Sequence, residues 1–508
     1  MFLELLTFAS LLLLPILFFL FKFSSHPNPK TSNLPKSYPI IGSFPSLYKN
    51  HRRRLQWFTD LLRASPTNTF TLHHSLGRHW VVTANPTVVQ HILKTNFPNY
   101  QKGEASRSTL ADLLGDGIFN VDGENWKFQR QVSSHEFNTK SLRKFVEQVV
   151  DTELSDRLIP ILSASAANNS VLDFQDILQR FAFDNICRIA FGYDPDYLLP
   201  SLPEAKFAVA FDDAVQISSE RFGLPHPVWK LKRALGIGSE KRLRAVVSEV
   251  REFANTIVRE KKQDLSEAKA LESVDLLSRF LSSGHSDEKF VTDIVISFTL
   301  AGRDTTSAAL TWFFWLLSQN PRVEQEILKE INDTASSESA AGGGYDEVKE
   351  MVYTHAALCE SMRLYPPVPV DSKHAVNDDI LPDGTKVKKG MKVTYHVYAM
   401  GRMEEIWGEH WAEYRPERWL ERGEESGTHK KWKFVGRDTY SYPVFQAGPR
   451  ICLGKEMAFL QMKRVVSGVL KRFKVVPRER EGGDEPELLA YLTGKMKGGL
   501  PVTILERA

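Results

Sequence analysis

The chain has 508 residues, of which 42% are hydrophobic and 25% charged, and its formal net charge is +3. This composition suits a folded globular body. With no basic tail and no zinc-ligand spacing, it predicts no nucleic-acid partner. Three cysteines, Cys187, Cys359 and Cys452, are too few and too scattered for a disulfide framework, which favours a reducing compartment.

The N-terminal segment differs from the rest of the chain. Residues 5–21, LLTFASLLLLPILFFLF, are almost wholly apolar. A membrane-spanning helix needs roughly 20 apolar residues, so the sequence predicts a single transmembrane anchor over residues 1–23. Basic residues follow it, beginning with Lys22, which predicts that the body is cytoplasmic. A cleaved signal peptide is the alternative. The acidic Glu4 and the missing small-x-small cleavage site disfavour it.

A proline-rich linker is predicted over residues 24–45, because its prolines prevent a helix and stiffen the chain. Residues 46–508 show no second linker and no internal repeat, and they are expected to form one large domain. We expect that domain to be mainly α with a smaller β region.

The first long helix is predicted within residues 172–191, which place five apolar side chains on one face: Leu172, Ile177, Phe181, Ile186 and Ile189. Strands are predicted near 80–83 and within 379–401. In the second stretch, the turn dipeptides Asp383-Gly384 and Lys389-Gly390 separate β-branched runs.

Residues 290–321 read as one long helix of about 30 residues, or roughly 45 Å, which ends at Asn320-Pro321. A second membrane span is the alternative for such an apolar stretch. Arg303 and Asp304 lie at its centre, where charged side chains are costly in a bilayer, so we reject that reading.

The segment FQAGPRICLG, residues 445–454, places Cys452 on a tight glycine-containing loop just before a predicted helix. The positive end of that helix dipole favours thiolate over thiol. A nucleophilic cysteine needs a base, and this segment has no histidine; a zinc site needs further ligands, and the other cysteines are remote. Haem iron needs only one protein thiolate, because the porphyrin supplies four ligands.

Five residues of this segment match F-x-x-G-x-R-x-C-x-G, the haem-binding signature of the cytochromes P-450: Phe445, Gly448, Arg450, Cys452 and Gly454. The chain resembles that family from the anchor to the C-terminus, and it is most similar to plant enzymes that hydroxylate fatty acids at the terminal, or ω, carbon. The resemblance implies the cytochrome P-450 fold, with a long central helix over the haem and the cysteine loop beneath it. Cys452 is the expected iron ligand.

The same resemblance implies roles for other residues. On the central helix, Asp304 and Thr305 resemble the acid–alcohol pair that delivers protons to dioxygen, while Ala301 and Gly302 would leave room for oxygen and substrate. A threonine bonded back to its own helix is the alternative for Thr305. Glu360, Arg363 and Arg418 resemble a buried group that supports the haem loop.

Further cofactor-binding residues are implied near the haem. Trp126 and Arg130 share a helix face and, with His374, resemble donors to the haem propionates; a solvated loop histidine is the alternative for His374. Phe445 and Arg450 belong to the same cofactor set. Some animal relatives carry a glutamate where Ala301 stands, and that glutamate esterifies the haem. The cofactor here is therefore expected to be non-covalent haem b.

No dinucleotide-binding fingerprint accompanies these motifs. The resemblance implies that electrons come from NADPH through a separate NADPH–cytochrome P-450 reductase. A basic face would steer that partner, and it would include Lys127, Arg130, Lys140, Arg143, Lys144 and Lys455. Ordinary solvated basic side chains are the alternative.

The substrate-facing segments are assigned by resemblance alone. Their apolar residues, any of which could instead be core, are Leu113, Ile118, Phe119, Phe298, Ala301, Val368 and Val370. An apolar pocket suits a lipid chain. We expect ω-hydroxylation of medium- to long-chain fatty acids, with ω-hydroxylation of jasmonoyl–amino acid conjugates as the alternative. A lipid hydroperoxide isomerase fits less well, because such enzymes lack the Asp304-Thr305 pair. A haem sensor without turnover is the fourth possibility.

The expected location is the endoplasmic reticulum membrane, with one span and a cytoplasmic catalytic domain. Residues 221–238 mix apolar side chains such as Trp229, Leu231 and Leu235 with basic residues. We expect this segment to dip into the bilayer surface, where lipid substrates enter.

Overall fold

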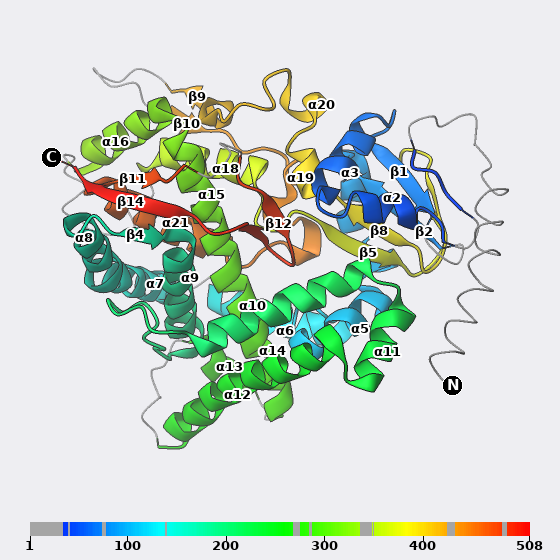
Figure 1. The fold of residues 1–508 in the computed structure, drawn as a ribbon, viewed down its shortest axis with the longest axis horizontal. Helices are drawn as coiled ribbons and strands as arrows, with labels where there is room; N and C mark the ends of the chain where they lie inside the picture. The colour runs from blue at the N-terminus through cyan, green and yellow to red at the C-terminus, as the bar shows by residue number, and fades with distance from the viewer. Residues whose placement is uncertain are drawn as a thin grey trace, which may run out of the picture. The chain divides into compact units, whose positions relative to one another are not determined.

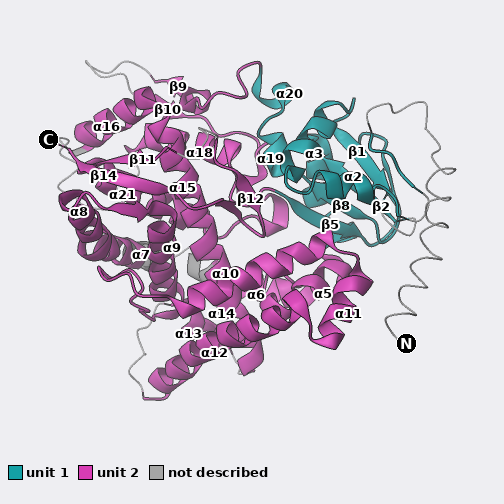
Figure 2. Cartoon of the chain, in the orientation of Figure 1, with its two compact units in different colours: residues 1–101, 370–408 teal, residues 102–369, 409–508 magenta. Residues whose placement is uncertain are grey.

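The computed structural model describes residues 34–38, 41–73, 78–137, 140–267, 275–283, 287–335, 348, 350–423, 432–479 and 485–507. It divides the chain into two compact units (Figure 2): unit 1 is 1–101 with 370–408, and unit 2 is 102–369 with 409–508. The predicted anchor lies outside the described residues, as does part of the predicted linker. Among the helices that are described, none is both long and apolar enough to cross a bilayer.

Unit 1 is built on a five-stranded sheet in the order β1-β2-β8-β5-β3. β2 and β8 pair in parallel, and the other pairs of this sheet are antiparallel. The strands are β1 (Thr69–His73), β2 (His79–Thr83), β3 (Tyr100–Gln101), β5 (Asp371–Ala375) and β8 (Lys392–Tyr395), with a separate hairpin of β6 (Asp379–Ile380) and β7 (Lys386–Val387).

The described helices of unit 1 are short: α2 (Phe44–Lys49), α3 (Arg54–Arg63), α4 (Pro86–Gln90), η2 (His91–Thr95), η3 (Phe97–Asn99), α19 (Val397–Met400) and α20 (Glu404–Trp407). The strands predicted near 80–83 and within 379–401 are confirmed, except that 397–400 is helical. Gly384 and Gly390 occupy the predicted turns with φ of 85° and 82°, a left-handed conformation that glycine adopts without strain.

Unit 2 holds most of the helices (Figure 1). They are α5 (Gly103–Leu114), α6 (Gly123–Phe137), α7 (Lys140–Glu153), η4 (Leu154–Leu158), α8 (Ile159–Ala167), α9 (Phe174–Ile186), η5 (Cys187–Phe191), α10 (Lys206–Glu220), η6 (Arg221–Gly223), α11 (His226–Leu235), α12 (Gly238–Ser266), α13 (Leu276–Ser282), α14 (Glu288–Thr299), η7 (Leu300–Asp304), α15 (Thr305–Ser318), α16 (Pro321–Ala335), α18 (Val352–Leu364), η9 (Pro416–Trp419), η10 (Pro443–Phe445), η11 (Gly448–Arg450) and α21 (Lys455–Leu470).

Small antiparallel sheets complete unit 2. One has the order β11-β14-β4, and β9–β10 and β12–β13 are hairpins. Their strands are β4 (Val171–Asp173), β9 (Leu420–Arg422), β10 (Trp432–Phe434), β11 (Phe473–Pro477), β12 (Leu488–Ala490), β13 (Gly494–Met496) and β14 (Pro501–Glu506). The prediction of a mainly α chain with a smaller β region is confirmed.

The helix predicted over 172–191 begins later than its apolar pattern suggested. Leu172 lies in β4, and Asp173 caps the helix by accepting a hydrogen bond from the Gln175 N–H. The remaining predicted core residues are buried: Ile177, Phe181, Ile186 and Ile189. The apolar pattern therefore identified the buried face, while the aspartate cap set the start of the helix.

The long central helix is not a uniform α-helix. α14 and α15 are joined by η7, a π turn over Leu300–Asp304, so the helix is continuous from 288 to 318 with one wide turn near its middle. π turns are rare and often mark functional positions. α15 packs against α9, α18 and β13, which places the wide turn inside unit 2.

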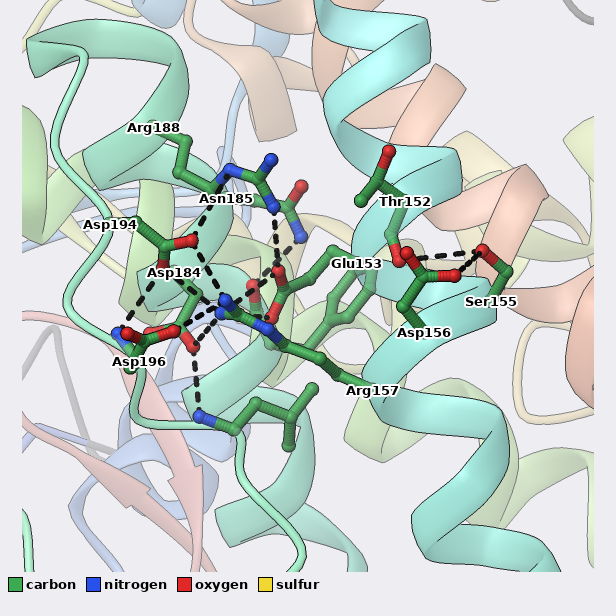
Figure 3. Close-up of polar contacts among 12 residues, drawn as sticks. Thr152, Glu153, Ser155, Asp156, Arg157, Asp184, Asn185, Arg188, Asp194 and Asp196 are labelled. Carbon is green, nitrogen blue, oxygen red and sulfur yellow. Dashed lines mark hydrogen bonds and ion pairs between the residues drawn. The ribbon is translucent and has the colours of Figure 1, made fainter.

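A partly buried ion network ties α7, η4 and α9 to the loop after η5. Figure 3 shows the Arg157 guanidinium among four carboxylates: Glu153, Asp184, Asp194 and Asp196. Burial raises the pKa of Glu153 to about 8, with the nearby Asp184 charge adding to the rise and Arg157 opposing it. Burial likewise raises the pKa of Asp184 to about 6.

Candidate functional site

Cys452 lies on the short loop between η11 and α21 of unit 2. Its N–H donates to the Phe445 carbonyl oxygen at 2.8 Å, which folds the segment back on itself. Gln446 and Gly448 adopt positive φ of 61° and 64° to make this turn. Cys187 and Cys359 are buried, whereas Cys452 is exposed. Among the cysteines, only Cys452 is therefore accessible to an external group.

Burial and nearby positive groups act in opposite directions on the Cys452 thiol. Burial raises the pKa of the Cys452 thiol, and the Gly454 N–H, Arg130 and Lys455 oppose that rise. The residue reaches solvent, but the protein atoms around its sulfur displace much of the hydration that a thiolate needs. Desolvation by the protein therefore opposes the thiolate form, and the preference for thiolate expected from the helix N-terminus stays a prediction.

Arginines and an aromatic ring surround the loop. The Arg450 guanidinium lies 4.5 Å from the centroid of the Trp126 ring, and its Nη2 donates to Asp122 Oδ1 and to the Val121 carbonyl oxygen, both at 2.8 Å. Arg130 Nη1 donates to the Ile451 carbonyl oxygen at 2.5 Å. These predicted cofactor residues all lie beside the cysteine loop, so they could meet the acidic groups of a cofactor held there.

A single-ligand metal centre fits these residues better than an all-protein one. In the part of the chain that the structure describes, no group of three or more His, Cys, Asp or Glu side chains could hold a metal ion. Within these described residues, a metal at Cys452 has no set of three or more protein ligands, so a group that brings its own ligands fits the site better. A porphyrin supplies four of them, so the accessible lone thiol and the adjacent arginines fit a haem.

Asp304 and Thr305 end the π turn and begin α15, respectively. The Thr305 hydroxyl donates to the Ala301 carbonyl oxygen at 2.5 Å. This is the alternative given above, in which the threonine is bonded back to its own helix. The Asp304 carboxylate is buried; its Oδ1 accepts from Arg303 Nη1 at 2.8 Å, and its Oδ2 has no partner among the described residues. No hydrogen bond joins the Asp304 and Thr305 side chains in the described structure, so their pairing stays a prediction.

The Cβ direction of Gly302 is filled by α9. A Cβ built on this residue would lie 2.4 Å from Ile186 Cγ1 and 2.6 Å from Ile186 Cδ1. Gly302 is nevertheless partly exposed. The expected room for oxygen or substrate beside it stays a prediction. Ala301 is partly exposed.

The candidate substrate residues of unit 2 lie in three segments, two of which are joined by one buried carboxylate. Asp293 on α14 accepts from the Asp116 N–H at 2.8 Å and from Arg251 Nη2 at 2.8 Å. This fastens the loop that carries Ile118 and Phe119 to the helix that carries Phe298. Phe119 is 40% exposed, whereas Leu113 and Phe298 belong to the buried core. Val368 is half-buried.

The three predicted support residues are brought together in unit 2. Arg363 Nη2 and Nε each donate to Glu360 at 2.8 Å, and Arg418 Nε donates to Glu360 Oε1 at 3.0 Å. Trp419 Nε1 adds a donor at 2.9 Å. Glu360 and Arg363 are buried, so each charge depends on the others for compensation.

The remaining predicted residues are placed as follows. His374 and Val370 belong to unit 1, where His374 pairs with Lys392 and Gln101 in the sheet. Of the predicted basic face, Lys127 is bound to Glu124 at 2.6 Å. The side chains of Lys140, Arg143 and Lys144 fall outside the described part of the chain. The propionate role of His374 and the basic docking face stay predictions.

Several polar residues near the site were not singled out from sequence. Asp122 holds Arg450, and Asp293 holds the loop after α5. Asp212 reaches the π turn through Arg303, and Lys495 binds Asp212. Their partners lie far away along the chain. Local patterns carry no signal for such pairs, so only the tertiary structure reveals them.

Comparison with known proteins agrees with this geometry. The sequence profile of the family described as cytochrome P-450 matches residues 33–498. The chain is 65% identical to "Cytochrome P-450 94A1" of Vicia sativa, covering 93% of this chain and 91% of that protein. It is 64% identical to "Cytochrome P-450 94A2" of the same plant, covering 97% and 96%. It is 50% identical to "Cytochrome P-450 94B1" of Arabidopsis thaliana, covering 99% and 98%.

Proposed function

The chain belongs to the cytochrome P-450 family and is a haem-thiolate monooxygenase, and we propose that it hydroxylates the terminal carbon of medium- to long-chain fatty acids. The observation that carries the proposal is the accessible Cys452 thiol on its turn, in a chain that matches the family over nearly its whole length. Electrons reach the enzyme from a redox partner, as in the family generally.

The haem supplies reductive activation of dioxygen and insertion of one oxygen atom into a C–H bond. Cys452 would hold its iron. Trp126, Arg130 and Arg450 would hold its acidic edge, and the guanidinium forks are suited to carboxylates. The reaction also consumes protons, since the second oxygen atom leaves as water. Asp304 is the buried acid beside the centre of the long helix, and we assign it the role of holding a proton.

An apolar chain end fits the residues that Asp293 joins. Ile118 and Phe119 follow the fastened loop, and Phe298 lies on the helix to which the loop is attached. A primary C–H bond is stronger than an in-chain one, so terminal attack depends on geometry that admits only the chain end. The two rigidly connected segments support such positional selection.

Reconstitution with NADPH–cytochrome P-450 reductase, NADPH and a panel of fatty acids tests the proposal. The position of the new hydroxyl is read by mass spectrometry. We expect the main product to carry it on the terminal carbon, and mainly in-chain products would contradict terminal attack. Jasmonoyl–amino acid conjugates are included in the same panel. A preference for the conjugates would assign the enzyme to that alternative substrate class.

We propose NADPH as the source of electrons and NADPH–cytochrome P-450 reductase as the partner. Lys455 at the start of α21 and Arg130 lie close enough to Cys452 to act on its charge, so positive charge stands on the thiolate side. Such a face would steer an acidic partner and make association weaken at high salt. Reductase titrations at two ionic strengths measure this dependence.

We further propose that the protein resides in the endoplasmic reticulum membrane through its N-terminal segment, with α11 as a second contact. Val228, Leu231 and Leu235 on α11 are 41%, 61% and 61% exposed, and Lys230, Lys232 and Arg233 lie between them. An exposed apolar row flanked by cations suits the surface of an anionic bilayer.

A further inference from the structure

Four charged groups from three elements meet at the π turn. Arg303 Nη1 donates to two carboxylates at once: Asp212 Oδ1 at 2.6 Å and Asp304 Oδ1 at 2.8 Å. Asp212 lies on α10. Lys495 on β13 places its Nζ 2.7 Å from the same Asp212 oxygen. The cluster therefore contains two cations and two carboxylates, but the cations are shared unevenly.

The unequal sharing follows from the contacts. Asp212 Oδ1 is bound by both Arg303 and Lys495. Asp304 is bound by Arg303 Nη1 alone, and that nitrogen also donates to Asp212. Asp304 Oδ2 is buried, and no described residue gives it a hydrogen bond. A buried ionised oxygen without a donor is costly, whereas a protonated carboxyl needs less compensation.

The surroundings affect the two acids in opposite directions. Arg303 and Lys495 outweigh desolvation at Asp212 and lower its pKa to about 2. At Asp304, burial raises the pKa against the opposing charges of Arg303 and Lys495, and the Asp212 charge adds to the rise. The other titratable group facing Arg303 is the Cys187 thiol on η5, whose pKa burial raises, so it stays neutral.

We propose that Asp212 is a positioning residue for proton handling. By occupying Arg303, it keeps Asp304 Oδ2 free of donors, so that Asp304 can hold a proton beside the reaction centre. Asp212 does not touch the substrate or the cofactor. It acts through the single guanidinium that the two carboxylates share.

The proton step balances without any further reactant. The O–H bond of the Asp304 carboxyl breaks as its proton passes to a neighbouring water molecule, which gives up a proton toward the reaction centre, and the carboxylate that remains is compensated by Arg303. A proton from bulk solvent then reprotonates Asp304, so one solvent proton is used and no hydroxide is left. Asp212 stays ionised throughout, so it neither gains nor loses a proton. This role rests on the proposed monooxygenase function, because only a proton-consuming reaction needs such a carrier.

Difference infrared spectroscopy of the full-length holoprotein tests the inference directly. The stretching band of a protonated carboxyl is followed as the pH rises, and the band that Asp304→Asn removes is assigned to Asp304. In Asp212→Asn, Arg303 is free to bind Asp304 alone. We expect the midpoint of the Asp304 band to fall by about one pH unit or more, a tenfold stronger dissociation. In Lys495→Gln, a cation that favours ionised Asp304 is lost, and the midpoint should rise.

Two further variants serve as matched controls. Asp213→Asn makes the same change one residue away on α10, where Asp213 binds Arg242 at the surface, and it should leave the midpoint unchanged. Asp212→Glu keeps the charge and should preserve the wild-type midpoint. If Asp212→Asn does not fold, as judged by thermal melting, the opposite shift in Lys495→Gln still tests the cluster. Equal midpoints in Asp212→Asn and Asp213→Asn would overturn the inference, as would a wild type without an Asp304 band.

Turnover supplies the second readout. In Asp212→Asn we expect the fraction of NADPH electrons recovered in oxidised lipid to fall severalfold relative to Asp213→Asn, with the difference appearing as reduced oxygen. A wild type that oxidises a different lipid overturns the proposed substrate and leaves the infrared result valid. A shifted band with unchanged electron recovery would overturn the proton-handling role alone.

Discussion

Gly302 on the π turn and Ile186 on α9 lie so close that a Cβ on residue 302 would stand 2.4 Å from Ile186 Cγ1. Real Cβ atoms do not approach other carbon atoms this closely. The Ile186 side chain is buried, so it has little space into which it could move. The glycine is therefore required by helix packing, and this contact fixes the position of the wide turn against α9.

Gly302→Ala should destabilise the protein by about 1–3 kcal/mol through overpacking. This loss should exceed the ~1 kcal/mol of stability that replacing glycine by alanine usually adds inside a helix. The same substitution should cost less in an Ile186→Ala background, because the clash is relieved. Urea unfolding of the four proteins in the double-mutant cycle measures the coupling. Additive effects of the two substitutions would contradict the packing role. Loss of turnover in Gly302→Ala at full stability would instead support the expectation that Gly302 leaves room for oxygen and substrate.

Cys452→Ala should abolish the red-shifted Soret band of the ferrous carbon monoxide complex, because the sulfur ligand is gone. Turnover should fall to background. Cys359→Ala is the matched control: Cys359 is buried, so this variant should keep the band although its stability falls. An unchanged spectrum in Cys452→Ala would refute the assignment of the iron ligand.

Glu360→Gln should destabilise the protein by about 3–5 kcal/mol, since it leaves Arg363 and Arg418 without their buried counter-charge. Thermal or urea unfolding measures the loss. Asp60→Asn is the control, because Asp60 and Arg53 form a pair in which both side chains are more than half exposed. Removing such an exposed pair should change stability by about 1 kcal/mol or less. Equal effects of the two substitutions would show that Glu360 has no special structural role.

The network around Arg157 predicts a pH dependence of stability. Glu153 has a folded-state pKa of about 8 against an ordinary 4.5. A raised pKa means that stability is fully present below the ordinary pKa and is lost as pH rises toward the folded value. The wild type should therefore lose stability between these two pH values, on the order of a few kcal/mol.

Glu153→Gln removes this titration and should show a flatter stability profile over the same range. The measurement is the free energy of unfolding as a function of pH. Asp156→Asn, three residues away along the chain and bound to Ser155 at the surface, should follow the wild-type profile. A Glu153→Gln profile as steep as that of the wild type would assign the pH dependence to other groups.

Leu231→Glu with Leu235→Glu should weaken membrane binding, because both side chains are exposed apolar residues of α11. The test is flotation with anionic vesicles of a chain that lacks the residues before Ser46, so that the N-terminal segment does not contribute. Complete solubility of that shortened chain before any substitution would count against α11 as a membrane contact. The control is Val171→Glu on β4, where an exposed valine lies away from α11 along the chain.

The amino-acid sequence determined the class of chemistry. Five residues around Cys452 are close together in the chain and need no tertiary contact to be recognised, and the apolar patterns of the helices depend only on local periodicity. The contacts of Glu360 with Arg363 follow partly from their helical spacing.

Other features came only from the tertiary structure. The helix predicted over 290–321 contains a π turn, which packs against α9 and is bound to α10 through the Arg303–Asp212 ion pair. Gly302 faces Ile186, which lies 116 residues earlier in the chain. Asp212 meets Arg303 across 91 residues, and Lys495, much later in the chain, meets the same Asp212. Residues so far apart meet only after folding, and the free energy that joins them comes from burial and charge compensation, which a linear pattern does not record.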